Sequence, residues 1–172
     1  MRVLTSSLDR LLLVVLACAV LAPAPITRAD DEHARPADGD IHDKVRSIWD
    51  AIVHDDPSRA HDAFFPREPF LEIKAMRDPG RYYDRLYARF EADVHALHAS
   101  TADLERASFD HFQLARRGGY VKPGEEGNRL PYWASRHCKL FYRVDGALRS
   151  LEVRVAITWS DHWYVIHLNE FH

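Results

Sequence analysis

The sequence contains little cysteine and little glycine, and it lacks the large charge excess that several protein classes need. Two cysteines and seven glycines in 172 residues exclude a disulfide-dense miniprotein and a collagen-like repeat. With 47% hydrophobic residues and a formal net charge of −3, the chain is not a long charged disordered segment either. We find no internal repeat. The length is that of one ordinary globular domain with one core.

No apolar run is long enough to span a membrane, since a spanning helix needs about 20 apolar residues. The longest run, residues 11–22, follows an arginine-bearing start and precedes Thr27-Arg28-Ala29, which places small residues at the two positions that a signal peptidase reads. We therefore expect residues 1–29 to be a signal peptide, the protein to be secreted or periplasmic, and no stable membrane span after cleavage. The alternatives are a retained anchor and lipidation of Cys18, which the bulky Leu16 disfavours.

Cleavage of this leader would change both the cysteine count and the charge of the chain. Cys138 would remain as a single cysteine without an internal disulfide partner, and its alternation with Leu140 favours burial over an intermolecular link. The leader carries three arginines and one aspartate, so the net charge of the remaining 143 residues is −5, which disfavours nucleic acid and anionic membranes as partners. All eleven histidines remain, and their protonation would reverse this charge, so surface association is expected to depend on pH between roughly 5 and 7.

The chain after the leader begins without a periodic pattern. Residues 30–39 are expected to form a flexible linker, and residues 40–172 a single α+β domain. Apolar residues at helical spacing from Ile41 to Val53 predict the first helix, with Asp40 as its N-cap.

Two further helices are predicted where an aspartate precedes a proline, because proline suits the first position of a helix. Asp56-Pro57 opens a short helix that Pro66 ends, and Pro66 with Pro69 predicts an extended bend. Asp78-Pro79 opens a third helix that runs to about Ser100. Three helices are therefore expected before the chain changes character.

After residue 100 the apolar period changes from 3.6 to 2, which predicts an antiparallel sheet of about four strands. Phe112 and Leu114 belong to a first strand, and a long connection covers residues 115–133. Asp145-Gly146 predicts a hairpin turn between two alternating runs. The last strand, residues 163–171, alternates two sets of side chains; if its even-numbered set faces the helices, its odd-numbered set lies on the outer face.

The end of the chain reads Trp159-Ser160-Asp161-His162-Trp163-Tyr164-Val165-Ile166-His167. This ending, after three helices and a meander of long strands, resembles the nuclear transport factor 2-like superfamily and its SnoaL-like branch over about residues 41–171. The resemblance implies three helices packed on a curved sheet, with a cone-shaped pocket between them. Enzymes of this superfamily use an Asp, His or Tyr in that pocket, and Trp163 and His167 match pattern positions here. That histidine is not a universal catalytic residue, and the loop at 115–133 departs from compact members, so no catalytic role is implied.

One loop concentrates residues suited to a polar ligand. Residues 124–133 contain two adjacent carboxylates, Arg129, Tyr132 and Trp133, a composition that could hold a ligand at the mouth of a pocket. Together with Trp163, these three are the candidate ligand-binding residues. The segment matches no catalytic or phosphate-loop motif, and the alternative is an exposed connection with its aromatic rings packed beneath it.

His167 is the candidate general acid or base, since imidazole titrates near neutral pH and needs a carboxylate to orient it. Asp110, Glu152 and His137 are the candidate neighbours across the sheet, whose register the sequence leaves open. The alternative is a hydrogen-bonded histidine with a structural role.

Three residues of the third helix share one face at metal-ligand spacing. Glu91, His95 and His98 lie at positions i, i+4 and i+7 and could ligate zinc or a similar ion. Such a site needs at least one more ligand from elsewhere in the chain, and the alternative is a solvated helix flank. No cofactor is expected.

These features favour a noncatalytic module that binds a small molecule or another protein, with a homodimer through the sheet as one form. The first alternative is a small acid/base enzyme, an isomerase or a hydrolase, that uses His167 in the pocket. The second alternative is a metal-binding domain built on Glu91, His95 and His98.

Overall fold

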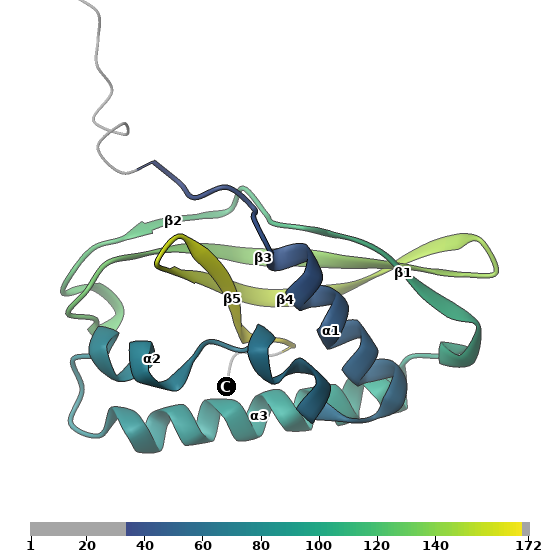
Figure 1. Ribbon diagram of the computed structural model, residues 1–172, viewed down its shortest axis with the longest axis horizontal. Coiled ribbons are helices and arrows are strands. Elements are labelled where there is room, and N and C mark those ends of the chain that lie inside the picture. Colours follow the sequence, from purple (N-terminus) through teal and green to yellow (C-terminus); the bar gives the residue numbers. More distant parts are fainter. Residues whose placement is uncertain (1–33, 170–172) are drawn as a thin grey trace, which may run out of the picture. The chain divides into compact units, whose positions relative to one another are not determined.

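The α-helices precede the strands along the chain, as the change of apolar period predicts (Figure 1). The computed structural model describes residues 34–169; the expected signal peptide and Cys18 lie outside the described residues. The helices before the sheet are α1 (Ile41–His54), the 3-10 helix η2 (Pro57–Ala63), α2 (Arg67–Ile73), α3 (Pro79–Ser100) and the short 3-10 helix η3 (Leu104–Arg106). In the part of the chain that the structure describes, no helix is long and apolar enough to cross a membrane.

α1 packs against the sheet through the apolar stripe that its sequence predicts. The Trp49 ring stacks on the ring of Tyr142 in the sheet, with centroids 4.7 Å apart. Asp40 stands at the N-cap, but its side chain makes no cap hydrogen bond. Its carboxylate lies 3.0 Å from the ammonium of Lys44 instead, so an ion pair replaces the predicted cap. The buried stripe consists of Ile41, Val45, Ile48, Trp49, Ala51 and Ile52.

The structure has one more helix between α1 and α3 than the sequence predicts. The expected short helix is η2, whose capping residue Asp56 accepts a hydrogen bond from the Ser58 N–H. The predicted extended bend at Pro66 and Pro69 is wrong, because α2 begins there with Pro66 at its N-cap. Both prolines fall where a helix has N–H groups without intrahelical partners, so neither interrupts α2.

α3 begins and ends where its sequence predicts. The Asp78 carboxylate accepts a hydrogen bond of 3.0 Å from the Arg81 N–H, and Pro79 is the first helical residue. Its buried stripe contains Tyr83, Leu86, Phe90, Val94 and Leu97. α2 and α3 contact each other and run along one side of the sheet (Figure 1).

The described strands form one strongly curled antiparallel sheet, which confirms the α+β class. Their order is β1-β3-β4-β5, and β2 pairs with β3 on the edge that β1 also uses, nearer the start of β3. The predicted hairpin turn at Asp145-Gly146 is confirmed, since Val144 opposes Ala147. The strands are β1 (Ala107–Gln113), β2 (Gly118–Val121), β3 (Tyr132–Val144), β4 (Ala147–Trp159) and β5 (His162–His167).

β2 lies inside the long connection that was expected at residues 115–133, and it makes the sheet one strand larger than predicted. Gly118 opposes Ser135 of β3 and has a φ of +133°. A Cβ atom at this position would collide with the carbonyl oxygen of Ala134. This glycine, which in the sequence is typical of a loop, therefore allows β2 and β3 to approach closely.

A bulge in β5 changes the face that its last residues present. Val165 opposes Ala156, but His167 opposes Val155, so Ile166 is an extra residue in the ladder. The strict alternation expected for this strand is broken. Both Ile166 and His167 consequently line a cavity between the sheet and the helices.

The described part of the expected linker contacts Trp163 of β5. The indole N–H of Trp163 donates a hydrogen bond of 3.1 Å to the carbonyl of Ala37. The Arg35 guanidinium lies 5.0 Å from the centroid of the same indole and donates to the carbonyl of Ala115 at 3.3 Å. A buried indole N–H needs an acceptor, and this stretch of backbone supplies one.

Candidate ligand-binding site

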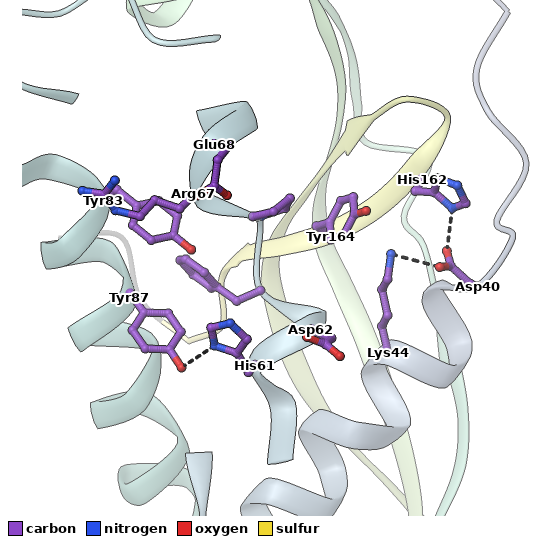
Figure 2. A pocket seen from close by; sticks show the side chains of 12 residues that line it. Asp40, Lys44, His61, Asp62, Arg67, Glu68, Tyr83, Tyr87, His162 and Tyr164 are labelled. Carbon is purple, nitrogen blue, oxygen red and sulfur yellow. Dashed lines mark hydrogen bonds and ion pairs between the residues drawn. The ribbon is translucent and has the colours of Figure 1, made fainter. Parts of the chain in front are cut away.

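A wide hollow, the α1–β5 groove, lies between α1, η2, α3 and β5 and has a volume of about 610 Å³ (Figure 2). Several of its polar groups contact one another. The Lys44 ammonium lies 3.0 Å from the Asp40 carboxylate and 3.5 Å from the ring centroid of Tyr164, and the His61 ring lies 3.0 Å from the Tyr87 hydroxyl (Figure 2). A polar ligand that bound to these four side chains would have to displace these contacts.

A narrower hollow, the Lys74 cavity, lies between the sheet and helices α2 and α3 and has a volume of about 360 Å³. Its apolar wall consists of Phe70, Tyr82, Leu86, Val155, Ile157 and Ile166, and its polar groups are those of Lys74, Glu126, Tyr132, Arg136 and His167. An apolar wall facing a few converging polar groups is the usual composition of a small-molecule site.

The polar end of the Lys74 cavity is a chain of hydrogen bonds centred on Asn128, which is only 2% exposed. The Lys74 ammonium donates to Asn128 Oδ1 at 2.7 Å, and Asn128 Nδ2 donates to the Tyr132 hydroxyl at 2.9 Å. The Tyr132 hydroxyl donates to Glu126 Oε2 at 2.8 Å, and Glu126 Oε1 pairs with the Arg136 guanidinium. Because each group has a partner, this chain fixes the positions of its members.

The backbone holds the end of α2 against the loop before β3, which includes the 3-10 helix η4 (Glu125–Gly127). Lys74 forms an isolated antiparallel bridge with Asn128. The Arg129 N–H donates to the Ile73 carbonyl at 2.7 Å, and the Arg129 guanidinium donates to the Lys74 carbonyl. These bonds satisfy carbonyls that a helix leaves without partners at its C-terminal end, and they place Lys74 at the cavity.

Burial and charge shift the ionisation of the groups in the cavity. Burial lowers the pKa of Lys74, although the charge of Glu126 opposes this effect. Burial, and then the hydrogen bond to Glu126, raise the pKa of the Tyr132 phenol, which therefore stays protonated at neutral pH. Burial lowers the pKa of His167, and the charges of Arg89 and Lys74 lower it further, so its imidazole is neutral at neutral pH.

The structure does not bring together all four residues that the sequence groups as ligand-binding candidates. Tyr132 lines the Lys74 cavity, whereas Arg129 anchors the end of α2 through hydrogen bonds to backbone. Trp133 lines another hollow, which Tyr132 also borders, and lies edge-on to the ring of Tyr120. Trp163 is fully buried beneath the segment that begins at residue 34.

His167 lies in the cavity, but its three candidate neighbours from the sheet have other partners. Asp110 is bound to Arg143 and to His111 at 2.6 and 2.5 Å. The His137 ring lies 2.6 Å from Glu152, which also pairs with Arg154. Two positive charges that act on His167 come from Lys74, at the end of α2, and from Arg89 on α3.

The candidate metal ligands on α3 point to separate partners. The His95 ring lies 2.6 Å from the Asp55 carboxylate, and the His98 ring lies 2.8 Å from the Ile52 carbonyl. Within residues 34–169, no three His, Cys, Asp or Glu side chains form a group that could hold a metal ion. Glu91 contributes only a charge that raises the pKa of Tyr87, secondary to burial.

Sequence reasoning missed the two residues on which the cavity depends most, Lys74 and Asn128. Both stand outside any apolar periodicity, and each comes directly after an element that the sequence does not predict, α2 and η4. The only signal was the position of Asn128 inside the loop at 124–133, which was singled out for its carboxylates and aromatic residues. Glu126 was one of those carboxylates.

Comparison of the chain with protein-family models, with curated proteins and with solved structures finds no significant match.

Proposed function

We propose that this chain is a noncatalytic ligand-binding protein that holds a small, mainly apolar molecule in the Lys74 cavity. The observation that carries the proposal is the apolar wall of six side chains that faces a hydrogen-bonded polar end. At about 30 Å³ for each non-hydrogen atom, as for water in the liquid, the cavity of about 360 Å³ has room for roughly a dozen such atoms.

Binding is favoured over catalysis because the polar groups at the end of the cavity already have hydrogen-bond or ion-pair partners. Both carboxylate oxygens of Glu126 have partners, one in Tyr132 and the other in Arg136. Each oxygen of this carboxylate therefore positions a neighbouring side chain, and a general base would have to give up such a contact to reach a bound molecule.

An acid/base enzyme is the second candidate, and one observation supports it. His167 lines the cavity, and its lowered pKa keeps the imidazole in the neutral form that accepts a proton. Hydrolysis of p-nitrophenyl acetate by the purified protein, lost in His167→Asn and retained in the matched surface variant His54→Asn, would support the enzyme. Equal rates for all three proteins would count against it.

The proposal includes the resemblance to the nuclear transport factor 2-like superfamily and the export of the protein to the periplasm or the cell exterior. A curled antiparallel sheet with helices along one side, and a cavity between them, is compatible with the cone of that superfamily. Export rests on residues 11–29 of the sequence alone.

Ligand binding is tested by titration with small amphipathic molecules and by a substitution that fills the cavity. The purified protein is titrated with octanol and with octanoate by calorimetry, and we expect saturable binding with a Kd on the order of 0.1 mM for the better ligand. Ile157→Trp replaces an aliphatic side chain of the apolar wall with a bulky indole that fills the cavity, and it should abolish binding. Leu148→Trp, on an exposed part of the same strand, is the matched control and should bind normally. Binding that Ile157→Trp leaves unchanged would contradict the proposal.

A further inference from the structure

The polar end of the Lys74 cavity carries more positive than negative charge. Glu126 and Arg136 form an ion pair, so their charges cancel locally. The Lys74 ammonium is acted on by the charge of Glu126, but its hydrogen bonds go to neutral oxygens, Asn128 Oδ1 at 2.7 Å and the Glu126 carbonyl at 3.4 Å. Among the side chains of residues 34–169, no carboxylate lies within 4.0 Å of the Lys74 ammonium. One positive charge at the cavity therefore has no anion of its own in ion-pair contact.

The neighbouring helix strengthens this imbalance. The charges of Arg89 on α3 and of Lys74 both act on His167, and both disfavour its protonated form. His167 lies beside Ile166 of the apolar wall, and both residues line the cavity.

We infer that the ligand of the Lys74 cavity is a small organic monoanion whose carboxylate pairs with Lys74 while its hydrocarbon part lies on the apolar wall. This inference rests on the proposed binding function and adds the chemical class of the ligand. A hydrogen bond between two charged groups in a partly buried site is stronger than one between neutral groups, so an anionic head should add affinity beyond the hydrocarbon contact.

The same charges argue against the other ligand classes. A cationic head would meet the charges of Lys74 and Arg136 and would gain only an already paired Glu126. A dianionic head would bring a second charge, and the cavity's other positive side chain, Arg136, is already paired with Glu126. A neutral head would leave the Lys74 charge without an ion-pair partner, as it is in the free protein.

The test compares three ligands of equal chain length on the purified wild-type protein. Octanoate, octanol and octylamine share the same hydrocarbon part and differ in head charge. We expect octanoate to bind about tenfold more tightly than octanol, and octylamine to bind most weakly. This comparison needs no variant, so it does not depend on whether a substituted chain folds.

A pair of lysine variants then locates the head group. Lys74→Met keeps the aliphatic stem and removes the charge, and we expect it to bring octanoate to within about twofold of octanol. Lys139→Met, on an exposed position of β3, is the matched control and should keep the tenfold ratio. A ratio that survives in Lys74→Met would overturn the assignment of the carboxylate to Lys74.

The failure of this inference differs from the failure of the proposed function. Equal binding of octanoate and octanol to the wild-type cavity would overturn the anion assignment and leave the binding function standing. Binding of none of the three ligands, or binding that Ile157→Trp does not affect, would overturn both.

Discussion

The Lys74 ammonium donates a hydrogen bond of 2.7 Å to the side-chain oxygen of Asn128, 54 positions further along the chain. This bond joins the C-terminal end of α2 to the loop that leads into β3, beside the backbone bridge between the same two residues. The bond also links Lys74 to Tyr132 at the polar end of the cavity, because the side-chain amide of Asn128 donates a hydrogen bond to the Tyr132 hydroxyl.

Asn128→Leu should destabilise the protein. The side chain of Asn128 is buried, and its loss leaves the Lys74 ammonium and the Tyr132 hydroxyl each without one hydrogen-bond partner. Unsatisfied buried polar groups cost about 1–3 kcal/mol, so we expect a loss of about that size in the free energy of unfolding, measured by urea denaturation. Asn128→Asp is the matched comparison, since it keeps an acceptor for Lys74. A loss below about 0.5 kcal/mol in Asn128→Leu would show that the bond to Lys74 contributes little.

The stability of the protein should fall as the solution is acidified through the range in which histidine titrates. Burial, Arg89 and Lys74 lower the pKa of His167 below its ordinary value of 6.5. The unfolded chain therefore takes up a proton at His167 at pH values where the folded protein does not, and the free energy of unfolding decreases as the pH falls from 6.5 to the lowered pKa. His167→Asn should reduce this part of the pH dependence, measured by urea denaturation between pH 7 and about pH 5.

The control for this prediction is the NMR titration of the His167 ring. A midpoint at or above 6.5 in the folded protein would contradict the sign of the effect. His54→Asn, a substitution on the exposed end of α1, provides the matched variant for the denaturation series.

Gly118→Ala should weaken the pairing of β2 with β3. The added methyl group would meet the Ala134 carbonyl, and the φ of +133° is unfavourable for alanine. We expect a loss of about 1–3 kcal/mol in the free energy of unfolding. Gly119→Ala is the matched comparison: its φ of +159° is also positive, but a Cβ at Gly119 meets no atom within 4 Å, so the cost of the collision should be missing there. Similar losses for the two variants would contradict the close approach at Gly118.

Zinc should leave the melting temperature of the protein unchanged. The His95 ring is directed to the Asp55 carboxylate and the His98 ring to the Ile52 carbonyl. Neither Asp55 nor Ile52 is in contact with Glu91, the third candidate ligand. A ligand that binds only the folded state raises the melting temperature, so a bound ion would be detected directly. A zinc-dependent rise that disappears in His95→Ala would support the metal-binding hypothesis instead.

The elements that the sequence predicts well are those with strong local signals. α1 and α3 have long apolar stripes, and the Asp145-Gly146 turn stands between two runs that alternate over many residues. α2 is short, and prolines such as Pro66 and Pro69 are compatible both with the start of a helix and with an extended bend. The sequence alone favours the extended bend, because the tertiary contacts of α2 are not visible in it.

The candidate site was less predictable than the fold because it depends on pairing register. His167 was placed correctly on the last strand, but a single extra residue at Ile166 decides which face it presents. Lys74 becomes a cavity residue only because Asn128 and Arg129 bind the end of α2 from a distant part of the chain. Contacts of this kind leave no periodic pattern in the sequence.

The most direct test of the account is the position of bound octanoate in the protein, measured by intermolecular NOEs between the ligand chain and the methyl groups of the protein. We predict NOEs from the octanoate chain to Leu86, Val155, Ile157 and Ile166, which share the apolar wall of the Lys74 cavity. NOEs to the rings of Phe64 and Tyr164 in the α1–β5 groove, with none to these four residues, would contradict it.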